Sequence, residues 1–256
     1  MNETLDFDSL ARRLDEAQMN RTDTSSLADD VDLDVDAAYA IQARLIGFRE
    51  QRGEKIIGTK LGFTSKAKMA QMGVSEVIVG RLTDAMQICD GDDIDLNHFI
   101  HPKIEPEVAY RLGQDVGMGE EARDVAECVD AVATAVEIID SRYRDFRFTY
   151  TDVVADNTSA AAFAVGAWQP LQHVDNRAVR LTVGNAEVVG STSAILGDPA
   201  RALRALGRVC RQRGIQLRAG DIILAGAATA ALPLTADVAR CEVAGLGDVT
   251  VKGVRA

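Results

Sequence analysis

The stretch that decides the fold reads His101-Pro-Lys-Ile-Glu-Pro-Glu-Val-Ala-Tyr110. Side chains two residues apart in a β-strand point to the same face, so a strand here aims the carboxylates of Glu105 and Glu107 at one point. Two bare carboxylates in that position repel each other and favour protonation of one of them. A hard divalent cation removes the conflict, because Mg²⁺ prefers oxygen ligands in octahedral geometry. The alternative is a pair of solvated acids on an edge strand.

A third acidic residue lies in an apolar run, Ala131-Val-Ala-Thr-Ala-Val-Glu-Ile-Ile-Asp140, which is typical of a buried strand. A buried carboxylate without a partner is costly, so Glu137 needs a cation or a strong hydrogen-bond network. The pattern therefore predicts one shared metal site formed by Glu105, Glu107 and Glu137. A salt bridge to Glu137 is the alternative explanation.

The composition describes an ordinary globular chain. Its 256 residues, 47% of them hydrophobic, predict one large domain or a domain with an appended segment. We divide it into an N-terminal helical segment, residues 1–52, and a β-rich catalytic domain, residues 53–256. The net charge of −11 argues against nucleic-acid binding and against a polybasic membrane contact. The longest apolar stretches are too short to cross a bilayer.

The cysteines and histidines carry little functional signal. The four cysteines are scattered without a C-x-x-C pair, and we detect no signal peptide, so a cytoplasmic location with reduced thiols is expected. The three histidines, His98, His101 and His173, lack metal-ligand spacing, and no Ser or Cys signature near them suggests a catalytic triad.

Hydrophobic spacing predicts helices first and strands later. Apolar residues recur with helical periodicity over residues 7–17 and 38–48, an acid-rich loop separates them, and Gly53 ends the second helix. Two later helices are predicted, one capped by Asp124 and running toward Val132, the other from Asp198-Pro199 to Gly214. Strands are predicted over residues 55–63, 107–112, 132–139, 161–165, 179–183, 222–224 and 248–251. This order favours an α+β fold around a rolled or barrel-like sheet.

Positively charged residues near these motifs are candidates for binding an anion. Lys60 lies between apolar residues in Gly58-Thr-Lys-Leu-Gly62, where it is either an edge residue whose amine reaches solvent or a charge held in a pocket. Three carboxylates and one Mg²⁺ leave negative charge, so an anionic substrate would need added cations. Lys60, Lys103 and Arg142 are the nearest candidates by motif.

Two further segments carry polar side chains. The stretch Asp140-Ser-Arg-Tyr-Arg-Asp-Phe-Arg-Phe148 mixes arginines with aromatic residues, but the acidic charge of the chain opposes RNA stacking, and arginines also hold carboxylates in a bidentate manner. Asn157 and Ser159 follow an apolar run at Val153-Val154 that we interpret as a strand, a place suited to turns or to site lining.

One motif resembles a dinucleotide site. Gly117-Met-Gly-Glu-Glu-Ala122 matches G-x-G-x-x-A ahead of the helix predicted from Asp124. The motif does not turn directly off its strand, however, and its two glutamates would place negative charge where a pyrophosphate should bind. A glycine-rich surface loop is the better interpretation.

Taken together, the motifs resemble one known family. Lys55-Ile-Ile-Gly-Thr-Lys-Leu-Gly-Phe-Thr-Ser65, the Glu-x-Glu strand, Glu137-Ile-Ile-Asp-Ser-Arg-Tyr143, Val154-Ala-Asp-Asn157 and Ala219-Gly-Asp-Ile-Ile-Leu224 are similar to the 2-keto-4-pentenoate hydratase / 4-oxalocrotonate decarboxylase family, a part of the fumarylacetoacetate hydrolase-like superfamily. The resemblance runs from about residue 35 to the C-terminus. Three segments, 66–74, 140–148 and 229–233, resemble the decarboxylase branch.

The resemblance implies a fold, a metal and a reaction. It implies the mixed β-roll or barrel core of that superfamily, Mg²⁺ or Mn²⁺ bound by Glu105, Glu107 and Glu137, and pocket residues at Lys60 and Asp84. The expected catalytic residues are Lys60, Asp84 and Arg142, where Arg142 is a candidate for orienting the departing carboxylate. Only the resemblance singles out Asp84. The expected substrate-binding residues are Lys66, Lys103, Asn157 and Ser159.

The implied reaction is decarboxylation of 2-oxohex-3-enedioate to 2-hydroxypenta-2,4-dienoate in meta-cleavage catabolism of aromatic compounds. The alternative is hydration of that product to 4-hydroxy-2-oxopentanoate. The resemblance also implies association with the pathway hydratase, so a noncatalytic partner of a companion enzyme is a further alternative. Homo-oligomers are the usual arrangement for such enzymes.

Overall fold

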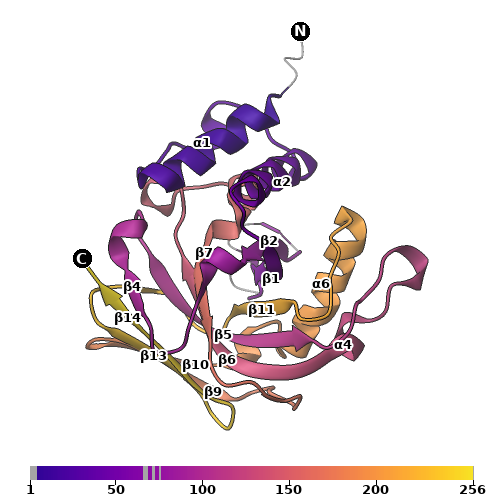
Figure 1. The fold of residues 1–256 in the computed structure, drawn as a ribbon, viewed down its shortest axis with the longest axis vertical. Coiled ribbons are helices and arrows are strands. Elements are labelled where there is room, and N and C mark those ends of the chain that lie inside the picture. Colours follow the sequence, from indigo (N-terminus) through magenta and orange to yellow (C-terminus); the bar gives the residue numbers. More distant parts are fainter. Residues whose placement is uncertain (1–4, 66–68, 71–72, 75, 256) are drawn as a thin grey trace.

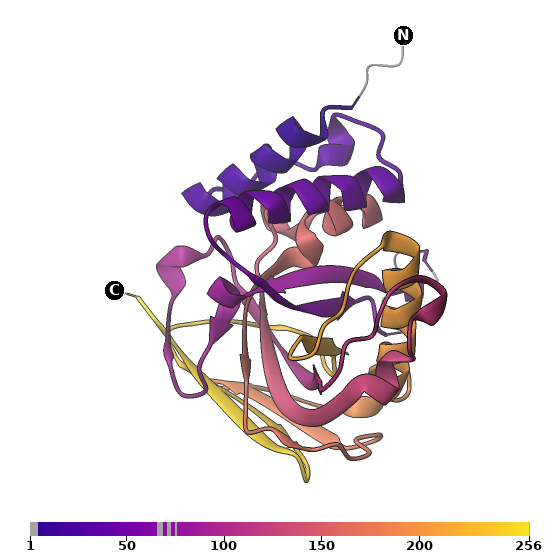
Figure 2. The ribbon, with the colours of Figure 1, turned by 45° about the vertical axis from the view of Figure 1, so that its right-hand side comes forward.

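The structure is a computed structural model that describes residues 5–65, 69–70, 73–74 and 76–255. Two helices at the N-terminal end form a layer above two curved sheets, and a third long helix stands beside the larger sheet (Figures 1 and 2). The α-helices are α1 (Phe7–Asn20), α2 (Val35–Gln51), α4 (Val125–Cys128), α5 (Tyr150–Ala155) and α6 (Ala200–Arg213). None of the described helices is long and apolar enough to cross a membrane.

The larger sheet places the functional strands at its centre. Its nine strands follow the order β2-β1-β11-β5-β6-β7-β3, with β12 beside β5 and β8 beside β6. The strands are β1 (Ile56–Gly62), β2 (Ile78–Thr83), β3 (Gln87–Ile88), β5 (Lys103–Leu112), β6 (Val129–Ile139), β7 (Ala160–Val165), β8 (Gln169–Pro170), β11 (Ile222–Ala227) and β12 (Leu232–Pro233). β5 therefore has neighbours on both sides, and the edge-strand alternative for its two glutamates is wrong.

The second sheet closes the other side of the main core. Its five strands follow the order β10-β9-β13-β14-β4. They are β4 (Asp93–Asp95), β9 (Ala178–Val183), β10 (Ala186–Ser191), β13 (Val238–Val243) and β14 (Gly247–Val254). The largest apolar cluster combines fully buried side chains of both sheets, among them Val108, Val132, Leu181 and Val249. Burial of such side chains is the main stabilising contribution to the fold. The architecture confirms the predicted α+β class with a curled sheet.

The N-terminal helices pack on the sheet through a core of their own. Asp6 and Asp34 cap α1 and α2 by accepting hydrogen bonds from the backbone amides of Ser9 and Ala37. The inner faces of both helices meet side chains of the remaining chain in one apolar cluster, which includes Leu14, Ile41, Leu45, Ile78, Tyr143 and Val154. The two predicted helices are confirmed, and they share this core with the segment around α5.

Two predicted elements have a different structure. The predicted helix from Asp124 toward Val132 ends after one turn, at Cys128, and the following residues form β6. The run at Val153-Val154, interpreted as a strand, lies in the short helix α5, which Thr149 and Asp152 start with a reciprocal capping box. Pairing with the remote strands β5 and β7 decided the first segment, whereas a local capping signal started the second.

Candidate metal centre

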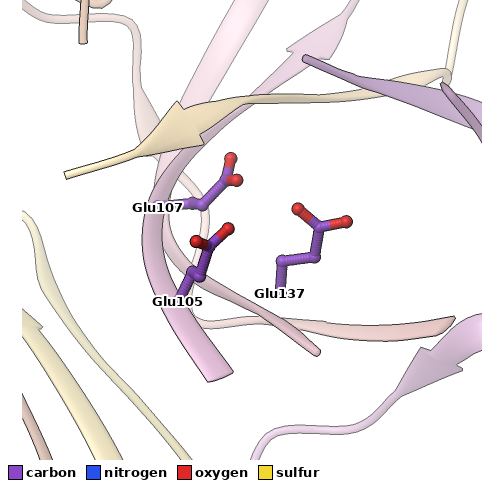
Figure 3. A group of neighbouring side chains, drawn as sticks. All are labelled: Glu105, Glu107 and Glu137. Atoms are coloured by element: carbon purple, nitrogen blue, oxygen red, sulfur yellow. The ribbon is translucent and has the colours of Figure 1, made fainter. Parts of the chain in front are cut away.

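The register of two antiparallel strands brings three glutamates together. Glu105 of β5 lies directly opposite Glu137 of β6, and Glu107 follows on the same face of β5. One carboxylate oxygen from each residue lies within 4.8 Å of the others, and all three side chains are buried. Figure 3 shows the three carboxylates pointing toward one another. The sequence-based prediction that these residues converge is therefore confirmed.

An irregularity in β11 supports Glu107 from the other side. The register between β11 and β5 shifts between Leu224 and Ala227, which frees the amide of Gly226 from the ladder. That amide donates a hydrogen bond of 2.7 Å to Oε2 of Glu107. Gly226 has φ +113°, and a Cβ there would lie 2.0 Å from Oγ1 of Thr64, so only glycine fits. The bulge thus orients one metal-ligating candidate.

Lys60 provides a positive charge beside the acids. Its Nζ lies 3.0 Å from Oε2 of Glu137 and donates a 3.0 Å hydrogen bond to the carbonyl oxygen of Thr158. The side chain is buried, so Lys60 is a charge held in a pocket and the alternative of an exposed edge residue is wrong. Burial disfavours its ammonium form, but the three carboxylates outweigh this effect, and the pKa of Lys60 lies above its usual value.

Burial disfavours the charged forms of Glu107 and Glu137 even beside Lys60. Burial raises the pKa of Glu107 well above its usual value, and the charge of Glu137 raises it further. Burial also raises the pKa of Glu137, against the opposing effect of Lys60. Two like charges 4 Å apart repel by about 4 kcal/mol at an effective dielectric constant of about 20. Glu107 and Glu137 therefore favour an additional positive charge.

The donor atoms fit a hard divalent cation. Within the described residues, Oε1 of Glu107 and both carboxylate oxygens of Glu137 are buried without a hydrogen bond, although Glu137 is ion-paired with Lys60. Buried polar atoms in native proteins usually have a hydrogen-bonding or metal partner, so these oxygens are candidates for binding a cation. An all-oxygen set suits Mg²⁺, Mn²⁺ or Ca²⁺. A divalent ion and the Lys60 ammonium together carry as much positive charge as the three carboxylates carry negative charge.

A cavity of about 370 Å³ opens beside Lys60 and Glu105. Its polar lining includes Thr64, Ser65, Thr158, Ser159 and Thr229, and its apolar lining includes Phe63, Ile78, Ile139, Phe146, Phe148 and Val153. A wider outer basin of about 810 Å³ shares Phe63, Phe146 and Phe148 with it. A volume of this size accommodates a small organic acid, and the shared aromatic residues lie between the cavity and the basin.

Two residues predicted to be catalytic lie outside the cavity lining. Asp84 is exposed, and its carboxylate accepts hydrogen bonds of 2.9 Å from the backbone amides of Lys55 and Ala85. Arg142 is buried, and its guanidinium is bound by Asp156 and by the backbone carbonyls of Asp140 and Ala160. Their positions give no support to direct contact with a substrate in the cavity.

Of the predicted substrate-binding residues, one lines the cavity and the others do not or lie outside the described residues. Ser159 lines the cavity, whereas the side chain of Asn157 is bound to the backbone of Arg81. Nζ of Lys103 lies 3.9 Å from the ring centre of Phe146, a cation–π contact. Lys66 lies outside the described residues.

Sequence analysis missed two features of the site. These are the three phenylalanines shared by the cavity and the basin, and the backbone carbonyl of Thr158. Phe63, Phe146 and Phe148 appeared in quoted motifs, but a phenylalanine in a motif is as typical of a core as of a cavity. The backbone oxygen of Thr158 has no side-chain signal at all. The dinucleotide alternative is wrong, because β5 and β6 on either side of residues 117–122 are antiparallel and no βαβ unit exists there.

Comparison with known proteins agrees with this geometry. Residues 55–252 match the family described as fumarylacetoacetate (FAA) hydrolase C-terminal. A 4-oxalocrotonate decarboxylase of Pseudomonas sp. is 48% identical over 244 residues, which cover 94% of this chain and 95% of that protein. A 2-keto-4-pentenoate hydratase of Burkholderia vietnamiensis is 37% identical over 228 residues, covering 86% of each chain.

A solved structure extends the similarity to the whole fold. The 4-oxalocrotonate decarboxylase from Pseudomonas putida G7, complexed with magnesium and adipate, matches with a TM-score of 0.92 and 34% identity. The match covers 99% of this chain and 100% of that one, including the N-terminal helices. The family match, the relatives and the shared fold lead to one conclusion: this chain belongs to the fumarylacetoacetate hydrolase family.

Proposed function

We propose that the chain is a metal-dependent decarboxylase that converts 2-oxohex-3-enedioate to 2-hydroxypenta-2,4-dienoate and CO₂. The observation that carries this proposal is the buried Glu105–Glu107–Glu137 triad at a cavity large enough for a small dicarboxylate. The similarity to 4-oxalocrotonate decarboxylases supports the choice of substrate. The six carbons of adipate, bound in one of those relatives, equal the chain length of the proposed substrate.

In this proposal the three glutamates hold Mg²⁺ or Mn²⁺. When bound, the cation supplies Lewis-acid stabilisation of the negative charge that develops on the C2 oxygen of the substrate. Breaking the C5–C6 bond releases CO₂ and sends its electron pair through the C3–C4 double bond toward that oxygen. A proton from solvent or from an acid completes the product.

Lys60 is the catalytic residue whose placement suits the reaction best. Lys60 lines the cavity, and its ammonium is ion-paired with Glu137, one of the metal-ligating candidates. There it stabilises negative charge on the 2-oxo acid end of the substrate or donates a proton to it. Ser159 lines the same cavity and is proposed to contact the substrate. The roles predicted for Lys66 and Asp84 stay predictions.

Hydration of 2-hydroxypenta-2,4-dienoate is the second candidate function, and the 37% identity to a hydratase favours it. Both reactions develop charge at the same oxygen, so the acidic triad does not distinguish them. A decarboxylase must accept a second carboxylate at the distal end of the cavity, whereas a hydratase must position a water molecule at C4.

Separate incubations with the two substrates test the proposal. With Mg²⁺ and 2-oxohex-3-enedioate we expect stoichiometric CO₂ release and formation of the dienol, both abolished by EDTA. Loss of the dienol without CO₂ release from the dicarboxylate would establish the hydratase instead. A protein that binds neither Mg²⁺ nor Mn²⁺ and turns over neither substrate would support a noncatalytic partner.

The cellular setting follows as part of the same proposal. A cytoplasmic location, a role in meta-cleavage catabolism of aromatic compounds, a homo-oligomeric state and a complex with the pathway hydratase all go with this activity. Size-exclusion chromatography with light scattering, alone and with the hydratase, measures the last two.

A further inference from the structure

The turn that follows α5 has an unusual backbone. Asn157, Thr158 and Ser159 have φ values of +46°, +55° and +58°, so three consecutive residues other than glycine adopt the left-handed conformation. L-residues with side chains rarely adopt it, and such strain persists where the surroundings enforce it, often at functional sites. Contacts on both sides hold this turn in place, and the turn places one backbone carbonyl against Lys60.

A buried ion pair holds the turn from one side. Nε of Arg142 is paired with the carboxylate of Asp156, whose Oδ2 accepts a 3.2 Å hydrogen bond from the backbone amide of Arg142 and a 3.3 Å bond from Oγ of Ser159. The same guanidinium donates to the carbonyls of Asp156 and Ala160, which flank the turn. Each nitrogen of the Arg142 guanidinium thus donates to a group of the protein itself.

Strand β2 holds the turn from the other side. The amide group of Asn157 accepts a 2.7 Å hydrogen bond from the backbone nitrogen of Arg81 and donates a 2.9 Å bond to its carbonyl oxygen. The neighbouring Gly80 lets the turn approach, because a Cβ there would lie 2.3 Å from Oγ1 of Thr158 and 2.7 Å from the carbonyl oxygen of Asn157. Any side chain at this position would push the turn outward.

The turn delivers one backbone oxygen to Lys60. The carbonyl of Thr158 accepts a 3.0 Å hydrogen bond from Nζ, and Glu137 lies 3.0 Å from the same nitrogen. An ammonium has three donors. Within the described residues, its partners are the Thr158 carbonyl through a hydrogen bond and Glu137 through an ion pair, so an N–H stays available to a molecule in the cavity that Lys60 lines. Without the carbonyl, the ammonium would be free to turn toward the three carboxylates.

We propose that Arg142, Asp156 and Asn157 are positioning residues that hold the Thr158 carbonyl against Lys60 and so aim one N–H of Lys60 at the substrate. The proposal rests on the proposed function in one respect, the catalytic role of Lys60. It assigns Arg142 and Asn157 a role through Lys60 in place of direct contact with substrate.

A double-mutant cycle tests whether these residues act through Lys60. We expect Asn157→Ala to lower kcat by about 100-fold, the effect of a misplaced catalytic group, with KM and the Kd for Mg²⁺ each changed less than 2-fold. In a Lys60→Met background, the same substitution should change the residual kcat by less than 2-fold. Equal losses in both backgrounds would overturn the proposal.

Two more variants separate positioning from loss of stability. Gly80→Ala pushes on the turn without removing a hydrogen bond, and it should reproduce the kcat loss of Asn157→Ala. Asp15→Asn removes the ion pair with Arg52 in the helical layer, so it serves as the matched control and should leave kcat unchanged. A kcat loss of similar size in the control would contradict a specific role of the turn.

A crystal structure of Asn157→Ala gives a result that does not depend on turnover. The distance between Nζ of Lys60 and the Thr158 carbonyl should increase from 3.0 Å to more than about 4 Å, beyond hydrogen-bonding range. An unchanged distance overturns the positioning role. A wild-type protein that releases no CO₂ refutes the proposed function instead, and the distance still tests the turn.

Discussion

Glu107 illustrates how one residue serves two conflicting requirements. Its side chain is buried, one oxygen is bound by the Gly226 amide, and the other has no hydrogen bond among the described residues. Burial and the charge of Glu137 raise its pKa well above the usual value, so the metal-free fold disfavours its charge. A divalent cation would turn this unfavourable charge into a favourable one.

Replacing Glu107 with glutamine should therefore have opposite effects on stability and on metal binding. Glu107→Gln removes a like charge and keeps the acceptor for Gly226, so the melting temperature in EDTA should rise. With Mg²⁺ at 100 times its Kd, wild-type protein should gain about 2.7 kcal/mol, or about 5–10 °C in a chain of this size. The variant should lose most of this gain and at least about 100-fold in kcat.

Differential scanning fluorimetry with EDTA and with MgCl₂ measures both effects. Glu187→Gln, at an exposed glutamate of the second sheet paired with Arg180, is the matched control and should change stability by less than about 0.5 kcal/mol. If Glu107→Gln melts below the wild-type protein in EDTA, repulsion between the carboxylates does not destabilise the metal-free protein.

The four cysteines should differ in their reactivity toward alkylating reagents. Burial raises the pKa of Cys210 and of Cys241 to about 12, so both thiols stay protonated at neutral and mildly alkaline pH. Cys128 is also buried, whereas Cys89 is exposed. Iodoacetamide at pH 8.5 should thus label the native protein once, at Cys89, and the denatured protein four times. Intact-protein mass spectrometry counts the labels, and rapid labelling of Cys210 in native protein would contradict the buried thiol.

At the scale of elements, local signals competed with strand pairing. The carboxylate of Asp124 does accept a 3.0 Å hydrogen bond from the amide of Ala126, as a helix cap should. The helix nevertheless stops at Cys128, because residues 129–139 pair with β5 on one side and with β7 and β8 on the other. Strand formation depends on such neighbours, so a prediction from the cap alone overestimated the length of the helix.

The bulge of β11 should link strand geometry to metal affinity. In Gly226→Ala, the left-handed backbone and the contact with Thr64 would shift the amide away from Glu107. We expect a loss of about 1–3 kcal/mol in stability and about 10-fold in Mg²⁺ affinity. Isothermal titration calorimetry and urea unfolding measure the two quantities.

Gly214→Ala is the matched control for this variant. Gly214 ends α6 with φ +64° and has no atom within 4 Å of an added Cβ. The substitution should cost about 1 kcal/mol from the backbone alone and leave Mg²⁺ affinity unchanged. Equal Mg²⁺ affinity in both variants would argue against a role of the bulge in metal binding.

At the scale of the whole molecule, the N-terminal helices are joined closely to the rest of the chain. Nε2 of Gln42 donates to the carbonyls of Val79 and Val154, and Oδ2 of Asp152 accepts a hydrogen bond from Oγ of Ser26. The helices also cover the apolar cluster around Tyr143. The packing therefore joins the two sides of the division at residues 52 and 53, and the division itself stays a prediction.

Deletion of residues 1–52 should therefore prevent formation of a stable fold. The truncated chain would expose one face of the cluster around Ile78, Tyr143 and Val154 and leave buried carbonyls without their donor. We expect aggregation, binding of a hydrophobic dye and no cooperative thermal transition in circular dichroism. A soluble 53–256 fragment with a sharp transition and Mg²⁺ binding would establish an independent catalytic domain.

The sequence by itself determined the features that depend on near neighbours. The alternation of a strand places Glu105 and Glu107 on one face, and the apolar run around Glu137 predicts its burial, because both follow from the local pleat and from composition. Those two facts pointed to a metal site with a salt bridge as the alternative, and the resemblance to a family strengthened the metal prediction and added the reaction.

Only the tertiary structure decided which groups meet across long separations. The partner of Lys60, the Thr158 carbonyl, lies 98 residues away, and the cross-strand register of Glu105 and Glu137 spans a loop and a helical turn. Arg142 looked like a substrate-binding cation in sequence, yet each nitrogen of its guanidinium donates to a protein group near Asp156. Such pairings depend on how remote segments pack, and no local periodicity encodes that packing.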